Sequence, residues 1–165
     1  SFITLFNRIK KRKMKFKALF ASLLLVGIIL SSCKEEVEEA SSIPNCDVLI
    51  ETNATDYVTL KIVNNYVTYV RSATALMPTN FELGYGGILI YRDQDDKIQG
   101  CDLACPVEAS RSVLVDVKMP FATCPQCGSR FDLTFGFAAP CGGPAKETLK
   151  RYKAIDTGNK IVVSN

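Results

Sequence analysis

Short runs of apolar residues, either alternating with polar ones or continuous, dominate the chain beyond its first third. Three such runs predict β-strands, at residues 57–63, 66–70 and 87–91. Four shorter runs, each bounded by Gly, Pro, Asp or Asn, predict further strands at residues 112–117, 130–134, 150–155 and 160–163. Polar residues at 92–97 and 156–159 predict the turns between neighbouring strands. No segment has a long helical period, so the pattern predicts an all-β domain, a small antiparallel sandwich or barrel.

The first 32 residues have a different pattern, which is typical of an export signal. A basic stretch is followed by an apolar run at residues 18–30, which is shorter than the roughly 20 residues of a membrane-spanning helix. Leu30-Ser31-Ser32-Cys33 resembles the bacterial lipobox, in which the cysteine receives a lipid and the signal is cut off before it. Met14 is a better start than Ser1, because it gives a signal of ordinary length. We therefore expect lipidation of Cys33.

This interpretation divides the chain into three parts. Residues 1–32 are the signal, residues 33–45 are the lipidated cysteine and an acidic tether, and residues 46–165 are one domain. The expected location is the bacterial cell envelope, with the domain on the periplasmic or exterior side and a lipid membrane as its first partner. Whether the membrane is the inner or the outer one stays open.

Charge and composition exclude several classes of function. Seven of the 20 basic residues precede Cys33 and all 17 acidic residues follow it, so the processed protein is acidic and has no clustered basic face for nucleic acid. The chain contains no histidine, which excludes Ser-His-Asp catalysis and histidine-ligated zinc or haem. We expect a protein that is not an enzyme.

Six cysteines remain in the processed chain, and four of them form two short pairs. Cys101 and Cys105 precede a spacer of eighteen residues, and Cys124-Pro-Gln-Cys127 follows it. Two such pairs on turns rich in Pro or Gly are a signal for a metal site, because four thiolates suit zinc or iron in a sulfur cluster.

These loops resemble those of Rieske-type ferredoxin domains. The second loop, from Cys124 through Gly128 to the Gly143-Pro-Ala145 segment, is similar to the Rieske pattern Cys-Pro-x-His-Gly followed by Gly-Pro-Ala. Cys105-Pro-Val is similar to the first Rieske loop, Cys-Pro-His, and follows a Gly-Gly-apolar strand. The resemblance implies a small Rieske-like antiparallel β domain with the cysteine loops in a subdomain at one end.

The sequence departs from the family at both histidine ligands, where it has Val107 and Cys127. Cys127 can bind iron as a thiolate, whereas Val107 cannot, and Cys101 is the nearest candidate for the fourth ligand. The resemblance therefore implies a [2Fe-2S] cluster on Cys101, Cys105, Cys124 and Cys127, with electron transfer to a redox partner protein as the function.

Two alternatives remain open from the residues. Zinc could occupy the same four thiolates, or the cysteines could form disulfides without any metal, since six cysteines allow fifteen connectivities. In either case the protein would be a structural or interaction lipoprotein without a redox role. Cys46 and Cys141 are expected to pair in a disulfide outside the metal site.

Overall fold

The computed structural model describes residues 41–71 and 82–165. The export signal, Cys33 and the acidic part of the tether predicted above lie outside the described residues. Within the described ranges, no helix is both long enough and apolar enough to cross a membrane.

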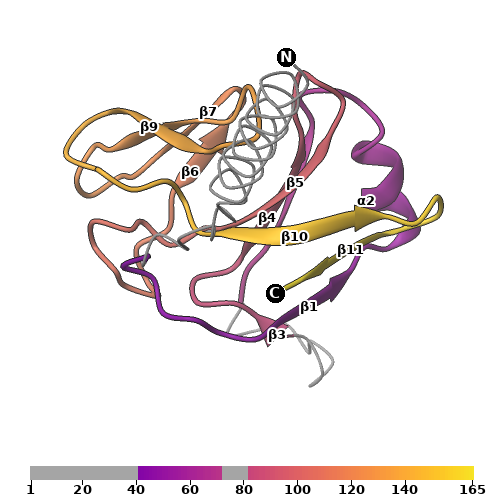
Figure 1. The fold of residues 1–165 in the computed structure, drawn as a ribbon, viewed down its shortest axis with the longest axis horizontal. Helices are drawn as coiled ribbons and strands as arrows, with labels where there is room; N and C mark the ends of the chain where they lie inside the picture. Colours follow the sequence, from indigo (N-terminus) through magenta and orange to yellow (C-terminus); the bar gives the residue numbers. More distant parts are fainter. Residues whose placement is uncertain (1–40, 72–81) are drawn as a thin grey trace, which may run out of the picture. The chain divides into compact units, whose positions relative to one another are not determined.

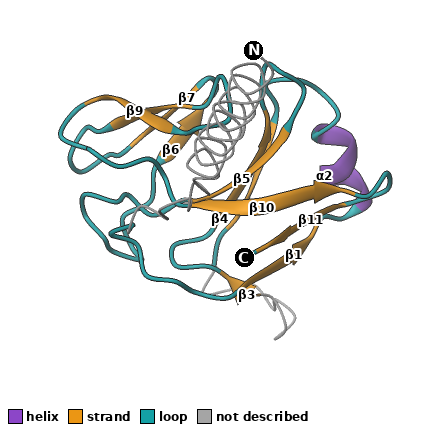
Figure 2. Ribbon diagram, in the orientation of Figure 1, coloured by secondary structure: helices purple, strands orange, loops and turns teal. Residues whose placement is uncertain are grey.

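Two antiparallel sheets make up the described domain (Figure 1). The larger sheet has seven strands in the order β2-β4-β5-β10-β11-β1-β3, and its strands are β1 (Val48–Glu51), β2 (Tyr66–Tyr69), β3 (Glu82–Leu83), β4 (Ile88–Arg92), β5 (Ile98–Asp102), β10 (Arg151–Asp156) and β11 (Ile161–Ser164). The smaller sheet is formed by four consecutive strands, namely β6 (Asp116–Lys118), β7 (Phe121–Thr123), β8 (Arg130–Asp132) and β9 (Ala139–Gly142). Strands and loops dominate Figure 2, and the all-β prediction is confirmed.

The core has two parts because successive side chains of a strand point to opposite faces of the sheet. Leu89 and Tyr91 of β4 belong to a cluster that reaches the smaller sheet through Phe131. Ile88 and Ile90 belong to a second cluster, which includes residues of β1 and β11. All five residues of β4 are buried, which explains why its first four residues, from Ile88 to Tyr91, form a continuous apolar run instead of alternating.

One predicted strand is wrong. Residues 57–63 alternate in polarity, but the structure places a short helix, α2 (Ala54–Thr59), at their start. The side chain of Asn53 accepts a hydrogen bond from the backbone N–H of Asp56 at 2.8 Å and so caps the helix. Tyr57 and Leu60, three residues apart on one side of the chain, are both buried. The N-terminal cap and the helical spacing of these two buried residues favour a helix over the strand that the alternating polarity predicts.

Several strands were not predicted, namely β1, β3, β5, β7 and β9, while the strand predicted at 112–117 is largely loop and only its end lies in β6. Before β6, Leu114 forms an isolated bridge with Ala104. The strand β5 matters for the candidate site, because it contains Cys101, one of the four predicted metal ligands.

Packed structure begins before residue 46, where the sequence-based division placed the start of the domain. Ile43 is buried, and Ser42 binds the carboxylate of Glu147 through both its backbone N–H and its hydroxyl, each at 2.8 Å. Lys150 donates to the backbone oxygen of Ile43 at 3.2 Å. Residues 42–45, assigned to the tether from the sequence, are therefore attached to the domain.

Candidate metal centre

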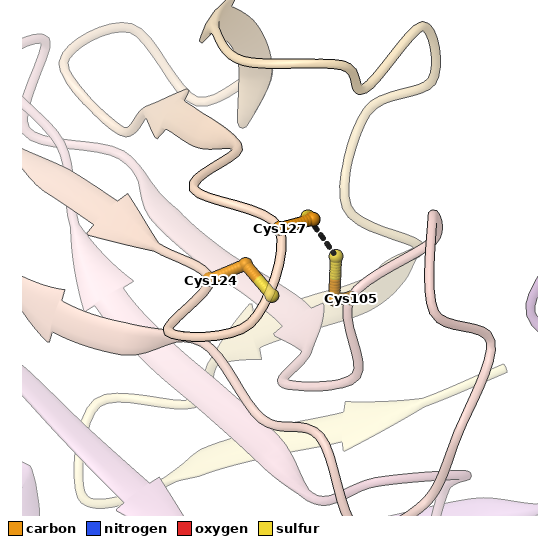
Figure 3. Close-up of side chains that lie close together, drawn as sticks. All are labelled: Cys105, Cys124 and Cys127. Atoms are coloured by element: carbon orange, nitrogen blue, oxygen red, sulfur yellow. Dashed lines mark hydrogen bonds between the residues drawn. The ribbon is translucent and has the colours of Figure 1, made fainter.

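Three cysteine sulfurs lie close together between two loops (Figure 3). Loop 1, residues 103–115, connects β5 to β6 and carries Cys105, and loop 2, residues 124–129, connects β7 to β8 and carries Cys124 and Cys127. Their Sγ atoms all lie within 4.8 Å of one another, and the Sγ atoms of Cys105 and Cys127 are 3.6 Å apart. Because thiolates are ligands for soft metal ions, this group is the candidate metal centre.

Asp102 fixes the start of loop 1. Its carboxylate is completely buried and accepts four hydrogen bonds, three from the backbone N–H groups of Tyr85, Gly86 and Ala104 and one from the Tyr152 hydroxyl, at 2.7–3.0 Å. These bonds join loop 1 to the segment before β4 and to β10. Asp102 is thus a structural residue that places the first cysteine loop.

Loop 2 is a tight turn closed by backbone hydrogen bonds. The N–H of Cys124 donates to the Ser129 oxygen at 2.8 Å, and the N–H of Gly128 donates to the Cys124 oxygen at 3.1 Å. Gly128 has a φ of +71°, which favours glycine. The Gly-Pro-Ala segment packs on this turn, because the Ala145 N–H donates to the Ser129 hydroxyl at 3.1 Å.

Polar groups in the loops stabilise negative charge on two of the sulfurs. Burial raises the pKa of Cys105 to about 12, and the backbone N–H groups of Glu108 and Val107 oppose this shift by hydrogen bonding to the sulfur. At Cys127 burial is the largest single influence and raises the pKa, but the hydroxyl and backbone N–H of Ser129 and the thiols of Cys124 and Cys105 together lower it below its ordinary value. The Sγ–Oγ distance between Cys127 and Ser129 is 3.1 Å.

Sequence reasoning missed two polar residues at this centre. The Ser129 hydroxyl contacts the Cys127 sulfur, and the side chain of Gln126 donates to the Glu108 carboxylate at 2.9 Å, joining loop 2 to loop 1. The sequence feature that could have pointed to Ser129 is its position two residues after Cys127, on a turn that contains a glycine. No sequence feature pairs Glu108 with Gln126.

Cys101 is not part of the three-sulfur group. It lies in β5, opposite Leu89 of β4, and is completely buried among apolar side chains near Tyr91. Burial raises the pKa of the Cys101 thiol to about 12, as it does for Cys105, so what separates the two residues is their position and not their pKa. The structure thus does not bring the predicted fourth ligand to the other three, because Cys101 is a strand residue directed into the core.

Cys46 and Cys141 are free thiols, as are the other four cysteines of the described residues. The guanidinium of Arg111 lies 3.7 Å from the Cys46 sulfur, and Nε of Arg130 lies 3.4 Å from the Cys141 sulfur. The disulfide predicted between Cys46 and Cys141 is therefore absent from the structure.

The donor set can be compared with the needs of a two-iron cluster. A [2Fe-2S] cluster takes four protein ligands, two for each iron. Three are assembled here, and among the described residues no fourth Cys, Asp or Glu joins them. Val107, at the position of a Rieske histidine, has a side chain without a donor atom and is 43% exposed. The residues fit a thiolate-bound metal but do not complete the set for two irons.

Comparison with known proteins gives matches only among solved structures. No family model matches the sequence, and no curated protein matches it. A quaternary ammonium Rieske monooxygenase in complex with an inhibitor is 14% identical over 71% of this chain, with a TM-score of 0.47, and this chain covers 30% of it. A chain from the complex of reduced oxygenase and oxidized ferredoxin in carbazole 1,9a-dioxygenase is 13% identical over 71% of this chain and 93% of its own length, with a TM-score of 0.43.

A third structure, of a protein described as an NADH-dependent nitrite reductase small subunit from Mycobacterium tuberculosis, is 16% identical over 72% of this chain and 96% of that one, with a TM-score of 0.41. The chain described here spans less than a third of the monooxygenase. These are Rieske-type proteins, the family that the cysteine loops of this sequence resemble.

Proposed function

We propose that this protein is a membrane-anchored electron carrier whose redox centre is iron bound by the thiolates of Cys105, Cys124 and Cys127. The observation that supports this function is the convergence of three sulfurs within 4.8 Å from two loops that are far apart in sequence. Iron bound by thiolates supplies a one-electron change of oxidation state.

The residues around the sulfurs have the properties that such a centre needs. Cys105 and Cys124 are buried and Cys127 is half-buried, so the protein excludes much of the solvent from the metal. The N–H groups of Val107 and Glu108 stabilise one thiolate, and Ser129 stabilises another. The fourth donor needed for the [2Fe-2S] form implied by the resemblance is not in this group, so the proposal is for iron bound by thiolates.

The anchor and the partner belong to the same proposal. The lipobox resemblance at Cys33 supports attachment to a membrane of the cell envelope through a lipid. An electron carrier held there exchanges electrons with a redox partner protein and carries out no chemistry on a substrate of its own. The absence of histidine from the whole sequence supports a role other than acid–base catalysis.

Reversible reduction tests this function. We expect the iron-loaded full chain to lose its visible absorption on addition of dithionite and to regain it on oxidation with ferricyanide. The Cys127→Ser variant should give a weaker visible absorption and a weaker response, and Cys141→Ser, which changes an exposed cysteine, should leave both unchanged.

Zinc at the same three thiolates is the second candidate, and the incomplete donor set for two irons favours it. Protein isolated with stoichiometric zinc, and without any reversible colour change after iron loading, would support this structural site and remove the electron carrier.

A further inference from the structure

The spacing of the three sulfurs bears on how many metal ions they can bind. Donors on one tetrahedral ion lie about 3.8 Å apart, given a metal–sulfur bond length of about 2.3 Å. The 3.6 Å between the sulfurs of Cys105 and Cys127 is close to this value, and every pair in the group lies within 4.8 Å. In a two-iron cluster the cysteines are divided between two ions, so at least one pair would have to lie further apart.

The pair at 3.6 Å is the informative one. In a Rieske centre the two cysteines bind one iron and the two histidines bind the other, so Cys127, at a histidine position, should lie apart from both Cys105 and Cys124. In this protein Cys127 is in contact with Cys105, and Cys124 completes a triangle with them (Figure 3). A triangle of this size can supply three corners of a tetrahedron around one ion.

The fourth corner receives no protein donor from the described residues. Val107 contributes none, and Cys101 lies in the core beside Leu89. The nearest carboxylate in sequence, that of Glu108, accepts a hydrogen bond from Gln126 and does not join the group. Because Cys127 is only half-buried and Val107 is exposed, solvent can reach this side of the loops.

We propose that Cys105, Cys124 and Cys127 bind a single metal ion and leave one coordination position open to water or a small external ligand. The single ion and its three sulfur donors are inferred from the distances between the sulfurs. The assignment of that ion as iron rests on the function proposed above.

Cobalt(II) is a suitable probe, because its visible spectrum reports both the number of thiolate ligands and the coordination number. The full chain, freed of metal under anaerobic conditions, is titrated with Co²⁺. We expect saturation at one cobalt per chain, strong thiolate charge-transfer absorption, and a shift of the d–d bands on addition of azide, which would enter the open position. Saturation at two cobalt ions, no binding, or bands insensitive to azide would overturn the proposal.

Cysteine variants identify the donors. Cys127→Ser should lower the charge-transfer intensity by roughly one third, because one of three metal–sulfur bonds is lost. Cys101→Ser is the matched control at the other candidate cysteine, and its cobalt spectrum should be unchanged. Circular dichroism of each variant verifies the fold. A changed spectrum for a folded Cys101→Ser variant would refute the assignment of three donors.

Iron loading separates this proposal from the electron-transfer function. Reconstitution with Fe²⁺ and sulfide should give one iron and no labile sulfide per chain. Two irons and two sulfides that cycle reversibly would overturn the single-ion site and leave the electron carrier intact. One iron that fails to cycle between dithionite and ferricyanide would support the single-ion site and remove the electron carrier.

Discussion

The buried carboxylate of Asp102 offers a quantitative test of how the first cysteine loop is held. Replacing it by alanine leaves three backbone N–H groups and the Tyr152 hydroxyl without their acceptor. A buried donor without a partner costs about 1–3 kcal/mol, so four such donors, partly rehydrated in the vacated space, predict a loss of about 4 kcal/mol or more. Since domains of this size are stable by about 5–15 kcal/mol, the Asp102→Ala variant should be close to unfolding.

Urea denaturation followed by circular dichroism measures this loss. Asp132→Ala is the matched control, because its half-buried carboxylate accepts one hydrogen bond, from the Thr134 N–H at 2.8 Å. This control should lose about 1 kcal/mol. If Asp102→Ala loses no more stability than Asp132→Ala, the carboxylate does not hold the loop in the way described. Asp102→Asn should lie between the two, because the amide keeps one acceptor oxygen but presents an NH₂ group to donors.

Three further perturbations test other parts of the structure. Gly143→Ala should destabilise the fold and weaken cobalt binding, because its Cβ would lie 2.6 Å from a backbone atom of the second cysteine loop, in addition to the strain of a side chain at positive φ. Gly158→Ala, which has the positive φ but open space around the new Cβ, should carry the strain alone, lose less stability and leave cobalt binding unchanged; equal effects of the two variants would contradict this packing. A hydrogen bond from the backbone N–H of Gly158 lowers the pKa of Asp156, and the guanidinium of Arg92 adds to this effect. The ionised carboxylate should therefore contribute its full stabilisation above the unfolded pKa of about 3.8, and this contribution should be lost as the pH falls through the lower pKa of the folded state. Comparing the acid unfolding of the wild type with Asp156→Asn measures this contribution, and a gap that stays constant down to about pH 2 would refute it. A thiol-reactive reagent should label Cys141 rapidly in the native protein, because this cysteine is exposed and free. Slow labelling that becomes rapid after reduction with dithiothreitol would show that Cys141 is in a disulfide instead.

The sequence predicts a strand correctly where the burial of the two strand faces determines which residues are apolar. Residues 87–91 were recognised because both faces of β4 are buried, which requires a continuous apolar run. Residues 57–63 were misassigned because alternation over a few residues is also compatible with a capped helical turn, and the decisive contacts, the burial of Tyr57 and Leu60, are tertiary. β9, with the sequence Ala-Pro-Cys-Gly, has no strand signal at all and forms only by pairing with β8.

For the site, sequence spacing predicted the two loops, and the structure brings together three of the four cysteines that were expected to bind metal. The spacing could not separate Cys101 from Cys105, because a short interval between cysteines does not say where a strand ends and a loop begins. Cys101 is still within β5, where alternation sends its side chain into the core, and Cys105 lies beyond the end of the strand. The orientation of a single side chain therefore decides whether the group has three sulfurs or four.

The order of strands in the larger sheet also has a consequence for biosynthesis. β1, near the start of the domain, pairs over three residues with β11, at residues 161–164, and otherwise only with the two-residue strand β3. A ribosome must therefore translate more than a hundred further residues before β1 can find its main partner, and contacts of such long sequence separation form slowly. Under the export proposed above, β1 would cross the membrane before its main partner, and this part of the sheet would close only after residue 164 had followed.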